Sequence, residues 1–528
     1  MDAAKVIQEG RATLGIEFGS TRIKAVLIDP GCNPIAQGSY KWSDSLVDGL
    51  WSYGIDEITK GMQECYADLK ADVLKRYGVP VRKLAAIGVS AMMHGYMAFE
   101  EDGSLLAPFR TWRNTNTGAA AKELSSLFVF NVPLRWSISH LYQAILDKEE
   151  HVPQIKYLTT LAGYIHWKLT GRKVLGVGDA SGMIPVDPAT CDYNAAMVEK
   201  FEALVAPCGF PWKLSGILPQ VLPAGADAGT LTAEGARLLD PSGELAAGIP
   251  LCPPEGDAGT GMVATNSVRE RTGNVSAGTS SFSMIVLEKD LSQPYDKIDI
   301  VTTPDGHPVA MVHCNNCTGE LNAWVGLFRE FAALMGYPER DDLFERLFTH
   351  SLEGDKDCGG LLCYNFLAGE PVVGFTEGRP LFVRSAGNGF TLANFFRMLV
   401  YTSVGALKMG NDILFVKEGV KVDRITAHGG LFITKGVAQR YLAAALDSPI
   451  SVMETAGEGG AWGIALLAAF RVMNPDGLLL PDWLDKCVFA GNTGLEVAPT
   501  PEEVAGFNAF MARYEAGLPI EEAAVRFK

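Results

Sequence analysis

The chain carries two copies of one short pattern, and this repeat constrains its fold more than any other feature. The stretch GIEFGSTRIKAVLI (Gly15 to Ile28) aligns without a gap on NVSAGTSSFSMIVL (Asn274 to Leu287). Each copy reads as an apolar strand, a tight turn at a glycine followed by hydroxyl side chains, and a second apolar strand, which is the pattern of a β-hairpin. Because the copies lie about half the chain apart, they predict two related domains.

The turns of the two hairpins have the residue types of a phosphate-binding loop. Glycine lets the backbone approach a ligand closely, and neighbouring N–H groups and hydroxyls can donate hydrogen bonds to phosphate oxygens. A single turn of this kind is common in α/β proteins without a ligand, but two copies predict two phosphate clamps that face each other and close on one nucleotide. The predicted phosphate-binding residues are Gly19, Ser20, Thr21, Arg22, Gly278, Thr279 and Ser280.

Length and patterning support a two-domain α/β protein. The 528 residues exceed the roughly 250–300 at which a single core stops growing, and strand patterns alternate with helical ones, as in α/β layers. We expect buried strands at 83–93 and 424–430, and helices at 157–171, 321–336 and 390–414. We expect domains at 12–266 and 267–480. The extension at 481–528 ends in a polar turn and an amphipathic helix, which would cap the second domain or contact a partner subunit, so a homodimer stays open.

Charge and composition exclude several classes of partner. With 45 basic and 61 acidic residues the formal net charge is −16, and no basic run tracks a phosphate backbone, so nucleic acid is not an expected partner. No apolar run reaches the roughly 20 residues of a membrane helix, and the N-terminus lacks the apolar core of a signal peptide. We therefore expect a cytoplasmic protein that acts on a small molecule.

The ten cysteines are irregularly spaced and do not form a disulfide framework. Cys314 and Cys317, with His313 beside them, have a zinc-like spacing, but a structural zinc site needs further ligands. The alternatives are a metal site here and reduced cysteines in and around a core.

Several ordered motifs resemble those of the FGGY family of carbohydrate kinases, and xylulokinases are nearest in pattern. The resemblance extends with gaps from about residue 14 to about residue 470. It includes both hairpins, MHG (93–95), PFRTWRN (108–114), PEGDAGTG (254–261), FLAGEP (366–371), AHGGLF (427–432) and GEGGAWGIAL (457–466). It implies two related actin-like (ribonuclease H-like) ATPase domains with a cleft between them, and an ATP-dependent kinase that phosphorylates a hydroxyl of a ketose (pentulose or hexulose) or a related polyol.

The resemblance assigns roles to individual residues. It places the catalytic base on Asp257, and chemistry supports this because a sugar hydroxyl needs a positioned base to lose its proton near pH 7. A helix N-cap or turn aspartate is the alternative. Mg²⁺ is assigned to Glu17 and Asp257. The implied sugar residues are Met93, His94, Gly95, Trp112, Asn114 and Asp257, and the implied nucleotide residues beyond the hairpins are Gly429, Gly430, Gly457, Gly459 and Gly460.

The sequence also departs from the family pattern. Glu17 stands where an aspartate is usual, Ala258 where an amide side chain is usual, and Met92 where xylulokinases carry a glutamine. Losing polar groups that reach sugar hydroxyls should change which sugar is chosen, so xylulose itself is not assigned. Trp112 as a core residue and His94 as a structural residue stay open. The alternative function is a nucleotide-dependent sugar-binding or regulatory protein that has lost phosphoryl transfer.

Overall fold

The structure is a computed structural model that describes residues 2–453, 459–491 and 494–527. The chain divides into two compact units, and each unit is assembled from separate segments of the sequence. The first unit comprises Met1–Arg269, Asp299–Val309 and Glu458–Gly491, and the second comprises Glu270–Ile298, Ala310–Gly457 and Asn492–Lys528.

The first unit is built on a mixed sheet that contains the first hairpin. Its strands lie in the order β13-β6-β1-β2-β3, and their bounds are β1 (Thr13–Phe18), β2 (Arg22–Ile28), β3 (Pro34–Lys41), β6 (Ala86–Ala91) and β13 (Glu255–Gly256). Strand β1 pairs antiparallel with β2 and parallel with β6. The apolar strand patterns on either side of the turn thus form the predicted hairpin, and β6 lies inside the predicted strand at 83–93.

The second unit repeats this arrangement around the second hairpin. Here β14 pairs antiparallel with β15 and parallel with β20, as β1 does with β2 and β6. The sheet contains β14 (Thr272–Ala277), β15 (Ser281–Val286), β17 (Pro308–Cys314), β20 (Arg424–His428), β21 (Ile450–Val452) and β22 (Leu495–Val497). The related sheets confirm the two related α/β domains inferred from the repeat.

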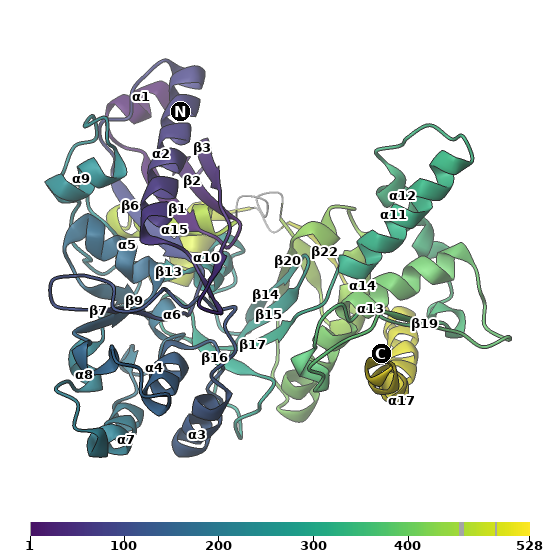
Figure 1. The fold of residues 1–528 in the computed structure, drawn as a ribbon. Coiled ribbons are helices and arrows are strands. Elements are labelled where there is room, and N and C mark those ends of the chain that lie inside the picture. The colour runs from purple at the N-terminus through teal and green to yellow at the C-terminus, as the bar shows by residue number, and fades with distance from the viewer. Residues whose placement is uncertain (1, 454–458, 492–493, 528) are drawn as a thin grey trace. The chain divides into compact units, whose positions relative to one another are not determined.

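Helix α15 (Gly459–Val472) belongs to the first unit although it comes late in the chain. A Cβ atom added at Gly15 of β1 would lie 2.1 Å from the carbonyl oxygen of Ala461, so glycine is what lets the helix backbone touch the strand. In Figure 1 the yellow-green helix lies against the purple strand. The range expected for the C-terminal domain, 267–480, included this helix, whereas its contacts lie in the first unit.

The helices expected at 321–336 and 390–414 form within two residues of those bounds. Helix α5 (Leu161–Thr170) ends at Gly171, which has φ +73°, but the expected helix at 157–171 begins instead with the short strand β8 (Tyr157–Thr159). The other α-helices of the described residues are α1 (Ala3–Gln8), α2 (Ile55–Tyr77), α3 (Gly118–Phe128), α4 (Ser137–Leu146), α6 (Val177–Ala180), α7 (Ala195–Val205), α8 (Leu214–Ile217), α9 (Ala233–Leu239), α10 (Asp257–Ala264), α11 (Gly319–Leu334), α12 (Leu343–His350), α13 (Leu392–Asp412), α14 (Val437–Leu446), α16 (Leu480–Trp483) and α17 (Pro501–Arg526).

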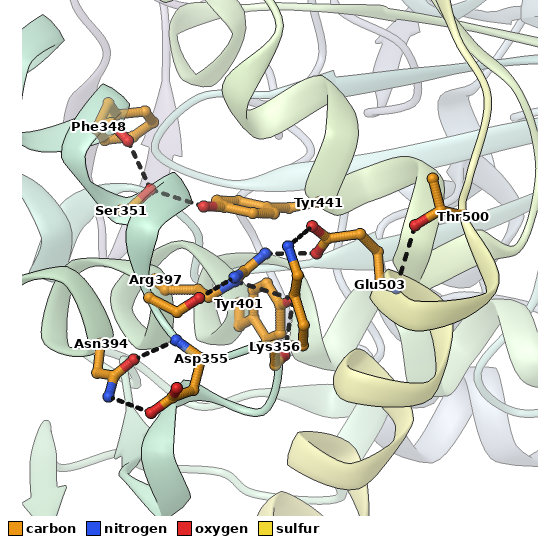
Figure 2. Close-up of polar contacts among 11 residues, drawn as sticks. Phe348, Ser351, Asp355, Lys356, Asn394, Arg397, Tyr401, Tyr441, Thr500 and Glu503 are labelled. Carbon is orange, nitrogen blue, oxygen red and sulfur yellow. Dashed lines mark hydrogen bonds and ion pairs between the residues drawn. The ribbon is translucent and has the colours of Figure 1, made fainter. Parts of the chain in front are cut away.

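The C-terminal helix α17 is fastened to the second unit by a buried ion pair (Figure 2). Arg397 of α13 is fully buried and pairs with Glu503 in the first turn of α17, which also pairs with Lys356. The guanidinium group lies over the ring of Tyr441, 4.9 Å from its centroid. Thr500 caps the helix by accepting a hydrogen bond from the N–H of Glu503. Of the expected extension, residues 494–527 belong to this second unit, whereas residues 481–491 belong to the first.

Among the helices of the described residues, none has both the length and the apolar character that crossing a membrane requires.

Candidate active site

Asp257 occupies the junction between strand β13 and helix α10 in the first unit. Its Oδ1 atom accepts hydrogen bonds from the N–H of Met93, at 3.1 Å, and of Ala258, at 3.0 Å. Desolvation raises the pKa of Asp257 to about 6, although these N–H groups act in the opposite direction. The strand end therefore presents a carboxylate that is ionised near pH 7 but more basic than an ordinary aspartate, which suits a general base.

Glu17 lies near the end of β1 in the same unit and interacts with Asp257. Burial, and then the negative charge of Asp257, raise the pKa of Glu17 to about 7, while Lys24 and the N–H of Ala461 lower it. A Cβ atom at Gly460 would lie 2.2 Å from Glu17 Oε1, so only glycine leaves room for the carboxylate at the start of α15. Gly459 beside it has φ +67°. Gly457 lies outside the described residues.

Two interacting carboxylates fit a divalent cation. The negative charge of Asp257 raises the cost of ionising Glu17, and a bound cation would remove that cost. Among the described residues no group of three or more His, Cys, Asp or Glu side chains is placed to hold a metal ion. Mg²⁺ is usually bound by one or two carboxylates together with phosphate oxygens and water, so Glu17 and Asp257 are the residues here that could hold it.

The MHG segment makes a strained turn after strand β6. His94 has φ +69° and Gly95 has φ +90°, and a residue other than glycine in this region indicates backbone strain that often accompanies function. The His94 ring lies 6.2 Å from the Trp136 ring in a stacked arrangement, and its Nδ1 atom is 3.1 Å from the carbonyl oxygen of Gly182. The turn also brings the N–H of Met93 to Asp257.

The tryptophan segment is tied to the first hairpin and to a neighbouring loop. Trp112 Nε1 donates a hydrogen bond to Ser20 Oγ at 3.0 Å, so a predicted sugar residue and a predicted phosphate residue are adjacent. Asn114 is buried, and its side-chain amide accepts from Trp51 N–H and donates to the carbonyl oxygens of Trp51 and Thr111. The Asn114 amide is thus committed to holding the main chain of β5 (Leu50–Ser52).

In the second unit the remaining predicted nucleotide residues lie beside the second hairpin. Gly429 follows β20 with φ +103°, and a Cβ atom there would lie 2.4 Å from the carbonyl oxygen of Ala277, the last residue of β14. Gly430 starts the short 3₁₀ turn that follows. The parallel pairing of β14 and β20 therefore brings the turn at 278–280 and the double glycine to one edge of the sheet.

Two buried carboxylates behind Asp257 were not anticipated from the sequence. Glu255 accepts hydrogen bonds from the N–H groups of Gly178, at 3.3 Å, and Asp179, at 2.9 Å, and Asp179 Oδ2 accepts one from the Thr160 hydroxyl at 2.6 Å. Desolvation raises the pKa of Glu255 to about 8 and that of Asp179 to about 7. The sequence signal available for these two residues was an acidic side chain within a run of small and apolar residues. Their contact could not be predicted from it, because the contact joins segments that are distant in the chain.

Cys314 and Cys317 are buried free thiols. No metal-binding group includes them in the part of the chain that the structure describes. Burial raises the pKa of the Cys317 thiol to about 12 and keeps it protonated.

Comparison with known families matches most of the chain. Residues 12–263 match the N-terminal domain, and residues 273–472 the C-terminal domain, of the FGGY family of carbohydrate kinases. An L-fuculokinase of Salmonella typhi is 23% identical over 257 residues, which are 46% of this chain and 50% of that protein. The chain thus spans about half the length of this curated relative.

Solved structures share the fold over nearly the whole chain. A ligand-bound xylulose kinase from Lactobacillus acidophilus is 16% identical, with a TM-score of 0.79 over 97% of this chain and 98% of that one. A gluconate kinase from the same organism is 16% identical, with a TM-score of 0.80 over 98% and 100%. A Plasmodium falciparum glycerol kinase with ADP is 13% identical, with a TM-score of 0.74 over 95% and 98%. At these identities the likeness concerns the fold alone.

Proposed function

Because the chain belongs to the FGGY family of carbohydrate kinases and has its two-domain, actin-like fold, we propose that it transfers the γ-phosphoryl group of ATP to a hydroxyl of a ketose, a pentulose or hexulose, or of a related polyol. The observation that carries the proposal is the placement of Asp257. Its carboxylate stands at a strand end beside Glu17 with a pKa of about 6.

Asp257 acts in this proposal as the general base. Its Oδ1 atom is held by two backbone N–H groups, so the carboxylate has a defined orientation, and its raised pKa brings it closer to the operating pH. It takes the proton of the acceptor hydroxyl as the oxygen attacks the γ-phosphorus. The bond from that phosphorus to the β,γ-bridging oxygen breaks, and ADP leaves.

The hairpin turns and the glycine-rich segments bind the nucleotide. The turns at 19–22 and 278–280 supply N–H and hydroxyl donors to phosphate oxygens. Gly429, Gly430, Gly459 and Gly460 let the backbone approach the rest of the nucleotide. Glu17 and Asp257 would hold Mg²⁺, which when bound neutralises charge on the phosphate oxygens.

The sugar lies against the strained turn at Met93, His94 and Gly95. Trp112 offers an aromatic face, while the Asn114 amide supports the loop, since its hydrogen bonds are taken by main chain. Met92 is buried in the apolar core of the first unit. Ala258 on α10, where an amide side chain is usual, favours an acceptor that differs from xylulose in its hydroxyl pattern.

The first test is coupled ADP release with Mg·ATP across ketopentoses, ketohexoses, deoxyketoses, their L-forms, and polyols such as glycerol and erythritol. Stimulation by one acceptor well above the acceptor-free rate is expected and would name the substrate. If no acceptor stimulates ADP release while ATP binding is shown separately, the transfer proposal is wrong and the sugar-binding alternative takes its place.

Asp257→Asn tests the base directly. With the active acceptor, kcat should fall by roughly 10²–10⁴-fold, the usual contribution of a general base, while ATP affinity and the thermal midpoint stay near those of the wild type. Asp192→Asn, at the exposed start of the short strand β11 (Asp192–Tyr193) in the same unit, is the matched control and should keep the wild-type rate. A near-wild-type rate for Asp257→Asn would remove this residue from the mechanism.

A further inference from the structure

Every carbonyl oxygen of the first predicted phosphate turn already accepts a hydrogen bond from the protein. Gly19 O accepts from Trp42 Nε1 at 2.7 Å, and Ser20 O accepts from the Tyr53 hydroxyl at 2.6 Å. Thr21 O accepts from the backbone N–H of Trp42 at 3.3 Å. Two aromatic residues therefore engage all three carbonyl groups of the turn at 19–21.

The two aromatic donors form a rigid unit. Trp42 and Tyr53 are buried, and their rings pack with centroids 4.2 Å apart. They follow strands β3 and β5, so the sheet and the loop near Asn114 fix their positions. Burial, and then the charge of Asp44, raise the pKa of Tyr53 well above its ordinary value. The Tyr53 hydroxyl is therefore a permanent donor at physiological pH.

The second phosphate turn has the same three carbonyl groups engaged by different donors. Gly278 O accepts from the Thr318 N–H at 3.0 Å and from the Thr318 hydroxyl at 2.8 Å. Thr279 O accepts from the Cys317 N–H at 2.9 Å, and Ser280 O accepts from the Gly278 N–H at 2.9 Å. Apart from the Gly278 N–H group, which belongs to the turn itself, these donors come from a segment that follows β17 in the second unit.

This second set of donors is also held from behind. The Asn365 side chain donates to the carbonyl oxygen of Cys317 at 3.0 Å, and the Asn316 side-chain amide donates to the buried carboxylate of Glu370 at 3.1 Å. The same carbonyl groups are thus engaged in both copies of the hairpin although the surrounding residues are unrelated. Because two unrelated sets of donors engage the same carbonyl groups, we infer that the turn itself requires these groups to be hydrogen-bonded.

The requirement follows from the electrostatics of anion binding. A carbonyl oxygen carries partial negative charge and repels a phosphate oxygen, whereas an N–H group attracts it. Within the described residues, the N–H groups of Ser20, Thr21, Thr279 and Ser280 donate to no protein oxygen. Glycine at the head of each turn makes reorientation of a peptide group inexpensive, so something must hold the carbonyl groups away from the ligand.

We propose that the donors behind the two turns, the side chains of Trp42 and Tyr53 in one unit and of Thr318 in the other, are positioning residues for nucleotide binding. By engaging the carbonyl oxygens, they keep the peptide groups oriented with N–H toward the phosphate chain of ATP. The inference rests on the proposed function, in which both turns bind that chain. It adds residues that touch neither nucleotide nor sugar.

Tyr53→Phe and Thr318→Val each remove one donor and leave the rest of the side chain nearly unchanged. Each should raise KM for ATP about tenfold, which corresponds to about 1.4 kcal/mol, while KM for the acceptor stays at the wild-type value. Thr318→Ser keeps the hydroxyl and should restore the wild-type KM for ATP. A purely structural role would not separate the two Michaelis constants in this way.

Matched controls exist in both units. The Tyr77 hydroxyl donates to the carbonyl oxygen of Ile35 at 2.6 Å, and the Thr402 hydroxyl donates to that of Cys363 at 2.6 Å; neither carbonyl group belongs to the two turns. Tyr77→Phe and Thr402→Val should therefore keep wild-type Michaelis constants. If these controls raise KM for ATP as much as Tyr53→Phe and Thr318→Val do, the effect is general and the inference is overturned.

The inference and the proposed function fail in different ways. Wild-type KM for ATP in both Tyr53→Phe and Thr318→Val, with phosphorylation intact, overturns the positioning role alone. If no acceptor is phosphorylated, the two variants and their two controls are compared by their ADP affinity, measured by calorimetry. Tenfold weaker ADP binding in the two variants than in their controls then supports the positioning role, and equal binding in all four overturns it. No nucleotide binding by the wild-type protein overturns both proposals.

Discussion

Individual buried carboxyl groups dominate the chemistry of the first unit. Glu255 is 1% exposed, and the groups that hold it are backbone N–H donors of Gly178 and Asp179. Glycines at 176 and 178 make room for it, since a Cβ atom at either position would lie 2.2–2.5 Å from a Glu255 carboxylate oxygen. The backbone that precedes Asp257 is thus held by Glu255, a carboxyl group whose ionisation costs free energy in the folded protein.

This cost predicts a pH-dependent stability. Desolvation and Asp179 raise the pKa of Glu255 to about 8 in the folded protein, against roughly 4.3 in an unfolded chain. The folded state therefore binds this proton more tightly, and the stabilisation is complete below about pH 4 and lost as the pH rises through about 8. Between about pH 5 and 8, the thermal midpoint of the wild type should fall relative to that of Glu255→Gln.

The measurement is a set of thermal melts at matched ionic strength. Glu234→Gln, which changes an exposed glutamate at the start of α9, is the control and should track the wild type at every pH. A constant difference between Glu255→Gln and the wild type from pH 5 to 8 would contradict the prediction, because a pH-independent effect reports packing and not ionisation.

At the scale of elements, helix α17 depends on one charged contact with α13. The Arg397 side chain is fully buried, and besides Glu503 it contacts the carbonyl oxygen of Gly354, at 2.6 Å, and the faces of Tyr401 and Tyr441 (Figure 2). Without Glu503 the guanidinium charge would stay buried with no acidic partner in this contact. Removing one member of a buried pair is far more costly than removing an exposed one.

Glu503→Ala should therefore lower the free energy of unfolding by about 3–5 kcal/mol. Glu522→Ala removes an exposed glutamate that pairs with Arg526 on the same helix, and it should cost less than about 1 kcal/mol. Urea denaturation followed by circular dichroism compares the two variants. Equal destabilisation would show that the buried pair contributes no more than a surface pair.

At the scale of the whole molecule, the first unit is discontinuous in sequence. Its sheet is formed by residues before 257, yet α15 lies on β1 and β6 through close backbone contacts at Gly15 and Gly88. Nearly all of α15 is buried, from Gly460 to Phe470. A fragment that ends after the first domain in sequence would expose the sheet face that this helix covers.

Residues 1–269 alone should accordingly lack a cooperative thermal transition. Joining residues 459–491 to that fragment through a flexible linker should restore one, because it returns the apolar surface of α15 to the sheet. Circular dichroism melts of both proteins test this. Cooperative unfolding of the 1–269 fragment near the wild-type temperature would show that α15 is dispensable for this unit.

Much of the fold was predictable because its signals are local. The hairpins follow from apolar strands around a glycine turn, and β6, α13 and β20 follow from runs of periodic hydrophobic residues. The assignment of Asp257 as the base stays a prediction that rests on the motif around it. The contacts of Asn114 were not predictable, since its amide is occupied by Trp51, a residue 63 positions away.

By itself the sequence determined two related α/β hairpin domains and a glycine-rich turn in each, because short-range periodicity and turn chemistry encode these features. Only the tertiary structure decided that Tyr53 and Thr318 engage the carbonyl groups of those turns, that Glu255 and Asp179 lie behind Asp257, and that α15 completes the first unit. These contacts join residues distant in the chain, and no local pattern specifies which partner a buried polar group meets.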